Sequence, residues 1–248
     1  MAISIDRVLE KLDSYFAKND YAAAERHLSY WKAEAKLAND DRANFFITNE
    51  QIGYYRKQGK KDLALQYVHE ILLLIDTMQM ENTISAATAY LNSATAYKAF
   101  AMAEKAMPLF QKAQKIYEQN LPKDDARLAG LYNNMALALC DLKQFEKAKG
   151  YYQKALAIMQ QQEDILDAAI TYLNLADALY QEKGATEAEA EINALMEKAK
   201  SILEQCKEKS DGYYAFVCEK CASTFGYYGY FAYKNELLER AGKIYAGN

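Results

Sequence analysis

Apolar and polar residues alternate along this chain with the period of amphipathic helices, and the pattern is clearest between residues 132 and 159. Two apolar-periodic stretches there are joined by a polar break at 142–145. The small residue Ala136 in the first stretch is placed to face Ala148 and Ala155 in the second. Because small side chains let two antiparallel helices approach closely, this segment predicts a helical hairpin.

The same spacing recurs along the sequence, with looser matches in the first, second and sixth units, so we expect a series of similar hairpins. In the clear repeats an alanine follows twelve residues after a small residue, which we call the marker. An aromatic or apolar residue comes four positions later and a second alanine three beyond that, as in Ala106, Phe110 and Ala113. The fifth repeat aligns only with an insertion of four residues at 185–188. Six helix–turn–helix units then cover nearly the whole chain, with the markers Leu12, Ile52, Ala94, Ala136, Ala176 and Ala222.

The junctions between hairpins agree with this division. Asp, Asn, Ser or Thr, which cap helix N-termini, occur before each later first helix, at 39–43, 81–83, 122–125, 163–164 and 209–212. Pro122 follows a second helix, where a stop is expected. Pro108 departs from the pattern, and we expect it within the first turn of its helix, where a missing N–H costs least.

Composition supports an all-helical chain. The 248 residues include only 10 Gly and 2 Pro, whereas sheet-rich proteins need more turn residues. The formal net charge of -4 disfavours binding to a nucleic-acid backbone. No apolar run approaches membrane-spanning length, and the charged N-terminal segment predicts an amphipathic helix and not a signal peptide. A cytoplasmic protein is therefore expected.

The four cysteines, Cys140, Cys206, Cys218 and Cys221, do not form a disulfide framework in a chain of this size. Cys218 and Cys221 have the spacing of a metal or redox pair, but neither histidine is close in sequence. We predict that both are small buried hydrophobic residues on one helix face. No metal or cofactor is expected.

The repeat resembles the tetratricopeptide repeat, whose usual period is 34 residues. A period near 42 predicts helices about one turn longer, and this longer form resembles the repeats of kinesin light chains and of Rap-type bacterial regulators. The resemblance implies one all-α domain over 1–248, a right-handed superhelix whose first helices line a concave groove and whose second helices, with His27 and His69, form the outer face. Larger residues replace the small ones in the first two repeats, so we expect wider helix spacing there; these are Leu12, Trp31, Ile52 and Ile71.

Three asparagines, Asn92, Asn134 and Asn174, lie two residues before the markers of consecutive repeats. In the family that this chain resembles, the position points into the groove. A primary amide offers both a donor and an acceptor, so it can pair with one peptide unit of an extended chain. First helices about 10 Å apart would meet a peptide at every third residue, since it advances about 3.3 Å per residue. Alternatively, these amides satisfy neighbouring helix ends or water.

Other residues on the same register are expected to flank the groove and to supply specificity. The basic ones belong to the second and third repeats and the acidic ones to the fourth and fifth, so a ligand with the opposite polarity would fit. The flanking residues are Asn49, Arg56, Lys57, Thr95, Lys98, Asn133, Asp141, Asp177 and Tyr180.

We therefore expect a non-catalytic scaffold that binds a peptide or a protein segment. An enzyme is the first alternative, but the sequence has no Gly-rich phosphate loop and no histidine placed in the groove. A signalling-peptide receptor is the second; since the first repeat begins near residue 6, it is expected to act through a partner protein. An adaptor that grips C-terminal carboxylates is a third, disfavoured because Asn49 and Gly53 stand where its lysine and asparagine would be.

The C-terminal hairpin ends the sequence without a polar capping helix, which repeat arrays normally carry. We expect Leu238, Ala241 and Ile244 to lie along an uncovered side, next to the aromatic turn at 225–231. This predicts a homodimer through the C-terminal hairpin. The alternative is that Lys234, Glu239 and the tyrosine hydroxyls make this end polar enough to stand alone.

Overall fold

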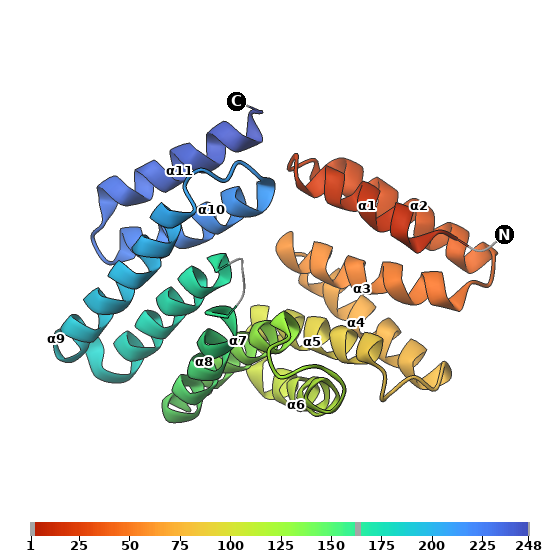
Figure 1. Ribbon diagram of the computed structural model, residues 1–248. Helices are drawn as coiled ribbons and strands as arrows, with labels where there is room; N and C mark the ends of the chain where they lie inside the picture. The colour runs from red at the N-terminus through yellow and green to blue at the C-terminus, as the bar shows by residue number, and fades with distance from the viewer. Residues whose placement is uncertain (1–2, 162–164, 248) are drawn as a thin grey trace. The chain divides into compact units, whose positions relative to one another are not determined.

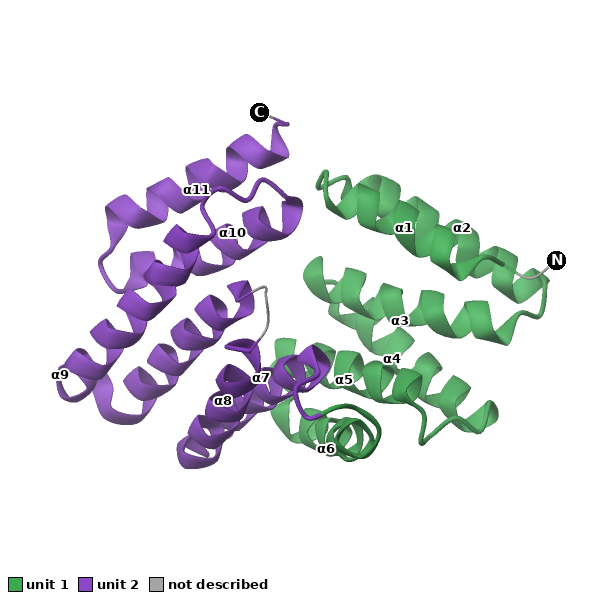
Figure 2. Cartoon of the chain, in the orientation of Figure 1, with its two compact units in different colours: residues 1–122 green, residues 123–248 purple. Residues whose placement is uncertain are grey.

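The computed structural model describes residues 3–161 and 165–247, and this part of the chain contains eleven helices and no strand (Figure 1). The predicted all-α class is confirmed. The chain divides into two compact units, Met1–Pro122 and Lys123–Asn248, which are described separately (Figure 2). In the described ranges, no helix has both the length and the apolar character needed to cross a membrane.

Unit 1 holds three hairpins and unit 2 holds the other three, each made of a first and a second helix. The helices of unit 1 are α1 (Ile5–Phe16), α2 (Tyr21–Leu37), α3 (Asp41–Lys57), α4 (Lys61–Thr77), α5 (Ile84–Ala99) and α6 (Ala103–Asn120). Those of unit 2 are α7 (Ala126–Asp141), α8 (Phe145–Met159), α9 (Leu166–Gln205), α10 (Gly212–Tyr227) and α11 (Phe231–Tyr245).

The predicted N-terminal caps are present on four first helices. Asp40, Thr83, Asp125 and Asp211 each accept a hydrogen bond from a backbone N–H in the first turn of the helix that follows. Such caps satisfy N–H groups that have no partner inside the helix. The fifth predicted cap, at 163–164, lies outside the described residues.

The turns inside the hairpins share one backbone feature. In five of them the residue seven positions after the marker has a positive φ: Asn19, Gly59, Ala101, Lys143 and Gly229. In the fifth hairpin the positive φ falls one residue later, at Gly184, with φ 81° and ψ 173°. Gly184 breaks α9 into a first arm, 166–183, and a second arm, 185–205, which turns back beside it (Figure 1).

One contact between the two helices of a hairpin recurs in the third, fourth and fifth hairpins. A lysine ammonium of the second helix lies over a tyrosine ring of the first, at 5.3 Å for Lys112 over Tyr90 and 5.5 Å for Lys154 over Tyr132. In the fifth hairpin Lys198 lies 5.4 Å over Tyr172. Lys198 comes four residues later in its repeat than Lys154 does, so the predicted four-residue insertion is confirmed. The inserted segment, 185–188, is helical.

The markers form the core of the hairpins, and all six are fully buried. Helices α5 and α6, like α7 and α8, come within 8 Å of each other over more of their length than α1 and α2 or α3 and α4 do. The prediction of wider spacing in the first two hairpins is therefore confirmed. The physical reason is that side chains such as those of Leu12 and Ile52 hold the backbones apart.

The prediction for Pro108 is wrong. Pro108 is the sixth residue of α6, in its second turn, where it cannot donate a hydrogen bond to the carbonyl oxygen of Glu104. Helix α6 begins nine residues after its marker Ala94, as α8 does after Ala136. The shared turn therefore sets where the helix begins, and the proline is accommodated inside it.

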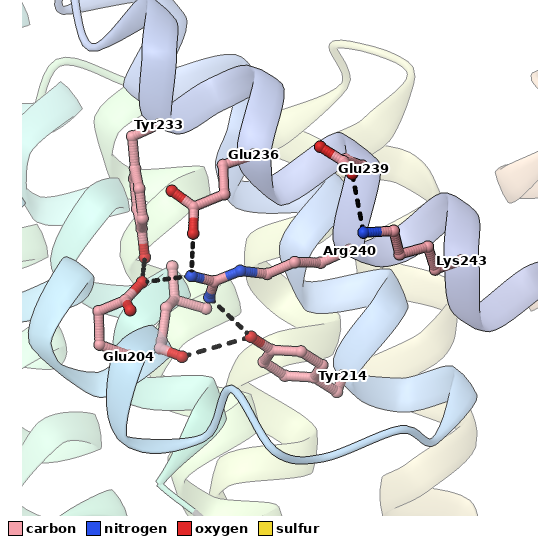
Figure 3. A network of polar contacts seen from close by, with 8 residues as sticks. Glu204, Tyr214, Tyr233, Glu236, Glu239, Arg240 and Lys243 are labelled. Atoms are coloured by element: carbon pink, nitrogen blue, oxygen red, sulfur yellow. Dashed lines mark hydrogen bonds and ion pairs between the residues drawn. The ribbon is translucent and has the colours of Figure 1, made fainter. Parts of the chain in front are cut away.

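A polar network joins the last two helices of unit 2 to the second arm of α9 (Figure 3). The guanidinium of Arg240 donates to Glu204 Oε1 at 2.7 Å, to the hydroxyl of Tyr214 at 3.0 Å and to Glu236. The hydroxyl of Tyr233 also donates to Glu204 Oε1, at 2.8 Å. Burial opposes the charge of Arg240, but its hydrogen bonds with Glu236, Tyr214 and Glu204 outweigh burial and raise its pKa.

The side of α11 that was expected to be uncovered is only partly so. Leu238 is 43% exposed, as predicted, and Ile244 is half-buried. The prediction for Ala241 is wrong, because this residue is fully buried. Ala241 lies next to Arg240, whose network draws α11 onto the rest of the unit.

Candidate functional site

We call Asn92, Asn134 and Asn174 the asparagine ladder. In unit 1 the first ladder residue, Asn92, is paired with another asparagine. The Asn92 side-chain nitrogen on α5 donates to the side-chain oxygen of Asn49 on α3, at 3.0 Å. The Asn49 amide in turn donates to Glu50 Oε1 at 3.2 Å. Burial raises the pKa of the Glu50 carboxyl, although the hydrogen bond from Asn49 opposes this.

Unit 2 repeats this pair. The Asn174 nitrogen on the first arm of α9 donates to the side-chain oxygen of Asn133 on α7, at 3.1 Å. Both pairs join the residue three before one marker to the residue two before the next. Asn134 instead donates to the backbone oxygen of Gly130 in its own helix, at 2.8 Å. The sequence placed Asn49 and Asn133 in the groove but did not predict that they bind ladder residues.

Each of the three ladder amides therefore uses one N–H within the protein. An amide has two N–H groups and a carbonyl oxygen. Among the described residues, nothing engages the second N–H or the oxygen of Asn92, Asn134 or Asn174. The alternative named neighbouring helix ends or water as the partners of these amides, whereas two amides bond to asparagine side chains and the third to a backbone oxygen of its own helix. A donor and an acceptor remain on each amide. We call the surface that these half-buried side chains share with the other first-helix residues of each unit the first-helix face.

The predicted basic residues lie on the first-helix face of unit 1. Arg56 is half-buried near the end of α3, and burial lowers the pKa of its guanidinium. The Lys57 ammonium lies 5.2 Å over the Phe16 ring, and Lys98 is half-buried near the end of α5. Thr95 donates its hydroxyl to the backbone oxygen of Leu91, so this side chain is turned to its own helix.

The predicted acidic residues lie in unit 2 and differ from each other. Asp141 is exposed at the end of α7, whereas Asp177 is half-buried on the first arm of α9. Asp177 Oδ1 accepts a hydrogen bond from the Tyr228 hydroxyl at 3.0 Å. Burial raises the pKa of the Asp177 carboxyl, although the hydrogen bond from Tyr228 opposes this.

Tyr180, one turn beyond Asp177, belongs to a cluster of three tyrosines, which we call the tyrosine cluster. The ring centroids of Tyr180 and Tyr227 are 5.5 Å apart and those of Tyr180 and Tyr228 are 6.1 Å apart, with the planes nearly perpendicular in both pairs. Such edge-to-face contacts are favourable for aromatic rings. Tyr227 remains 64% exposed.

Tyrosines of the tyrosine cluster line two cavities of unit 2. The first, which we call the aspartate pocket, has a volume of about 380 Å³ and is lined by Asp177, Tyr180, Gln181, Ser223, Thr224 and Tyr227. The second, of about 570 Å³, lies on the side of the hairpin turns and includes Gly229 and residues of the second arm of α9. The sequence missed Ser223, although it follows its marker Ala222 as Asp177 follows Ala176.

Cys218, Cys221 and the two histidines, whose side chains could react or bind a metal, lie where the sequence predicted. Cys218 and Cys221 are fully buried on α10, and burial raises the pKa of both thiols, so the prediction of buried hydrophobic residues is confirmed. His27 and His69 lie on the second helices α2 and α4, as predicted. The described ranges bring together no group of three or more potential metal ligands.

Comparison with known proteins agrees with the repeat analysis. The family model described as tetratricopeptide repeat matches residues 127–201. These residues are tetratricopeptide repeats. No curated protein matches the chain. The match covers the fourth and fifth repeats, which contain Asn133, Asn134 and Asn174.

Solved structures with tetratricopeptide-like repeats share the fold. A putative kinesin light chain of Podosopora anserina is 18% identical, with a TM-score of 0.53 over 81% of this chain and 94% of that one. BtubC (BKLC) of P. vanneervenii is also 18% identical, with a TM-score of 0.52 over 99% of this chain and 92% of that one. The predicted resemblance to tetratricopeptide repeats of the kinesin light chain kind is confirmed, as is the fold class.

Proposed function

We propose that the chain is a non-catalytic scaffold that holds an extended peptide, or an extended segment of a partner protein, on its first-helix face. Tetratricopeptide repeats generally mediate protein–protein interactions, and solenoids of this kind use the surface lined by equivalent positions of successive repeats. One observation carries the proposal. The side-chain amides of Asn92, Asn134 and Asn174 each donate one hydrogen bond within the protein and keep a second N–H and an oxygen for a ligand.

The remaining donor and acceptor match the C=O and N–H of one peptide unit, whatever side chains the peptide has. The bond to the protein fixes the orientation of each amide before the peptide arrives, which reduces the entropy lost on binding. Two net hydrogen bonds per asparagine, at about 0.5–1.5 kcal/mol each, give roughly 3–9 kcal/mol for three asparagines before association costs. Affinity of this size is modest, so flanking residues must select the partner.

The charged residues of the first-helix face are the basis for a proposal about how the partner is selected. Unit 1 presents Arg56, Lys57 and Lys98, and unit 2 presents Asp141 and Asp177. We propose that the bound segment carries acidic residues where it meets the first set and basic residues where it meets the second. We also propose that the scaffold acts in the cytoplasm, as expected from the sequence.

A triple substitution of Asn92, Asn134 and Asn174 by alanine tests the proposal. Capture of binding partners from the native lysate should fall at least tenfold, because each alanine removes both hydrogen bonds to the peptide. The matched control replaces three exposed asparagines outside the first helices by alanine: Asn82, Asn120 and Asn235. Asn120 donates to a carbonyl oxygen one turn back in its helix, as Asn134 does, so the control also loses a bond of this kind.

Circular dichroism should show that both triple variants keep the helical content of the wild type. If the ladder variant is folded and still captures every partner of the wild type, the asparagines are not the binding site. The control should bind as the wild type does.

We also propose that the C-terminal hairpin forms a two-fold dimer. Leu238 and Phe231 of α11 are both exposed large apolar residues. Light scattering at tens of micromolar protein should give a dimer mass that Leu238→Glu splits. A monomer mass for the wild type would rule the dimer out.

A further inference from the structure

The aspartate pocket contains a carboxylate whose charge is not balanced. Asp177 is half-buried, and within the described parts of the chain it forms no ion pair. Among the described residues, Asp177 forms one hydrogen bond, which Oδ1 accepts from the Tyr228 hydroxyl at 3.0 Å. A carboxylate has about four acceptor positions, so most of its capacity faces the pocket or solvent. A partly desolvated carboxylate of this kind is stabilised by a cation placed beside it.

The same pocket offers aromatic rings to a cation. Tyr180 and Tyr227 both line it, and their ring planes are inclined by 84° with centroids 5.5 Å apart. The face of a tyrosine ring attracts a cation, and arginine uses this contact more often than lysine. Ser223 and Thr224 line the pocket too, and their hydroxyl oxygens can accept hydrogen bonds from a cationic group.

We propose that the aspartate pocket binds a basic side chain, arginine in particular, of the segment held on the first-helix face. The planar guanidinium can stack on one tyrosine ring while its parallel N–H groups bond to the carboxylate of Asp177. A volume of about 380 Å³ is at the small end of ligand sites, as suits one side chain. The inference rests on the proposed function, since it assigns a specificity subsite to the same surface.

The position of the pocket fits a peptide held by the ladder. Asn174 and Asp177 are three residues apart on the first arm of α9, so their side chains lie on one helix face about one turn apart. The ladder places the peptide across the first helices, so Asp177 is offset from the peptide by about one turn, roughly 5 Å, along the axis of α9. The long side chain of an arginine beside the peptide unit that binds Asn174 can span this offset and bring its guanidinium into the pocket.

Small probes test the pocket without the ladder. Nα-acetylarginine amide and its neutral isostere Nα-acetylcitrulline amide are titrated against the full chain at constant ionic strength, with backbone amides followed by NMR. Arginine amide should shift the signals of Asp177, Tyr180 and Tyr227 and bind at least tenfold more tightly than citrulline amide. Asp177→Asn should reduce this preference to twofold or less. The matched control, Glu187→Gln, removes one exposed charge from the second arm of α9, outside the pocket lining, and should leave the preference unchanged.

Asp177→Asn keeps the shape of the side chain and an oxygen for the Tyr228 hydroxyl, so the pocket should survive. Tyr227→Leu, at an exposed ring, gives a second variant and should weaken arginine amide binding at least threefold. Equal affinity for arginine and citrulline amides, or a preference that persists in Asp177→Asn, would overturn the subsite. These results do not depend on Asn134 and Asn174, so a failure of the ladder variant in the capture experiment is distinguishable from a failure here.

Discussion

Replacing Arg240 by methionine should destabilise unit 2 by about 2–3 kcal/mol. Methionine keeps most of the apolar stem of the arginine but removes its guanidinium, which is bonded to Glu204, Tyr214 and Glu236 (Figure 3). The change therefore isolates the polar part of the contact.

The magnitude follows from burial. The Arg240 side chain is 17% exposed, whereas those of Glu204 and Glu236 are 39% and 52% exposed. Breaking a fully buried ion pair costs about 3–5 kcal/mol and an exposed one about 0–1 kcal/mol. Water can resolvate both carboxylates here, so we expect a value between these limits. Loss of the contact of the guanidinium with the Tyr233 ring, 5.8 Å away, is included in it.

Urea unfolding followed by far-ultraviolet circular dichroism measures the change. Lys243→Met is the matched control, because Lys243 lies on the same helix and forms a 2.8 Å ion pair with Glu239 in which both side chains are about two-thirds exposed. It should cost no more than about 0.5 kcal/mol. Equal losses for the two variants would refute the reasoning. The fluorescence of Trp31, on α2 of unit 1, reports whether the units unfold together.

Three further predictions concern stability. Burial raises the pKa of Glu204, but the hydrogen bonds from Tyr233 and Arg240 outweigh burial and lower it. The contribution of Glu204 to the free energy of unfolding is therefore complete above the unfolded pKa of about 4.3 and is lost as the pH falls. In urea titrations the stability difference between wild type and Arg240→Met should shrink below pH 4. Gly53→Ala should stabilise the protein by about 1 kcal/mol, because a Cβ at this helical position meets nothing within 4 Å. Gly184→Ala should destabilise it by at least 1 kcal/mol, because φ is 81° there. Thermal melts should therefore show a higher Tm for the first variant and a lower Tm for the second. Lys32→Met should cost about 2–4 kcal/mol in urea unfolding followed by Trp31 fluorescence, because buried Lys32 forms a 2.8 Å ion pair with Glu70 and bonds to Thr48.

The sequence predicted the hairpins and their order because each hairpin depends on local signals. Small or apolar markers, caps such as Asp40 and Asp211, and turns seven or eight residues after the marker all act within one repeat. Pro108 could not be placed correctly, since the turn before α6 and the packing of that helix outweigh the cost of a proline in its second turn. The burial of Ala241 depends on contacts between elements far apart in sequence.

For the site, the register predicted which residues share the first-helix face but not what they bond to. Asn174 and Asn133 are 41 residues apart, and their hydrogen bond depends on the relative height of two helices. The sequence predicted only some of the residues that line the aspartate pocket. Asp177 and Tyr180 were identified by register, whereas Tyr227 enters through the packing of α10 against α9.

The asparagine pairs also have a consequence for how repeats stack. Asn49 with Asn92, and Asn133 with Asn174, each need two neighbouring first helices at one relative height. A slip by one turn would move one amide about 5.4 Å along its axis and separate the two. A buried asparagine fixes the alignment of coiled-coil helices in a similar way. Transplanting the second, third, fourth or fifth hairpin alone into another array would therefore divide such a pair. The smallest modules that keep a pair intact are the second hairpin with the third and the fourth with the fifth.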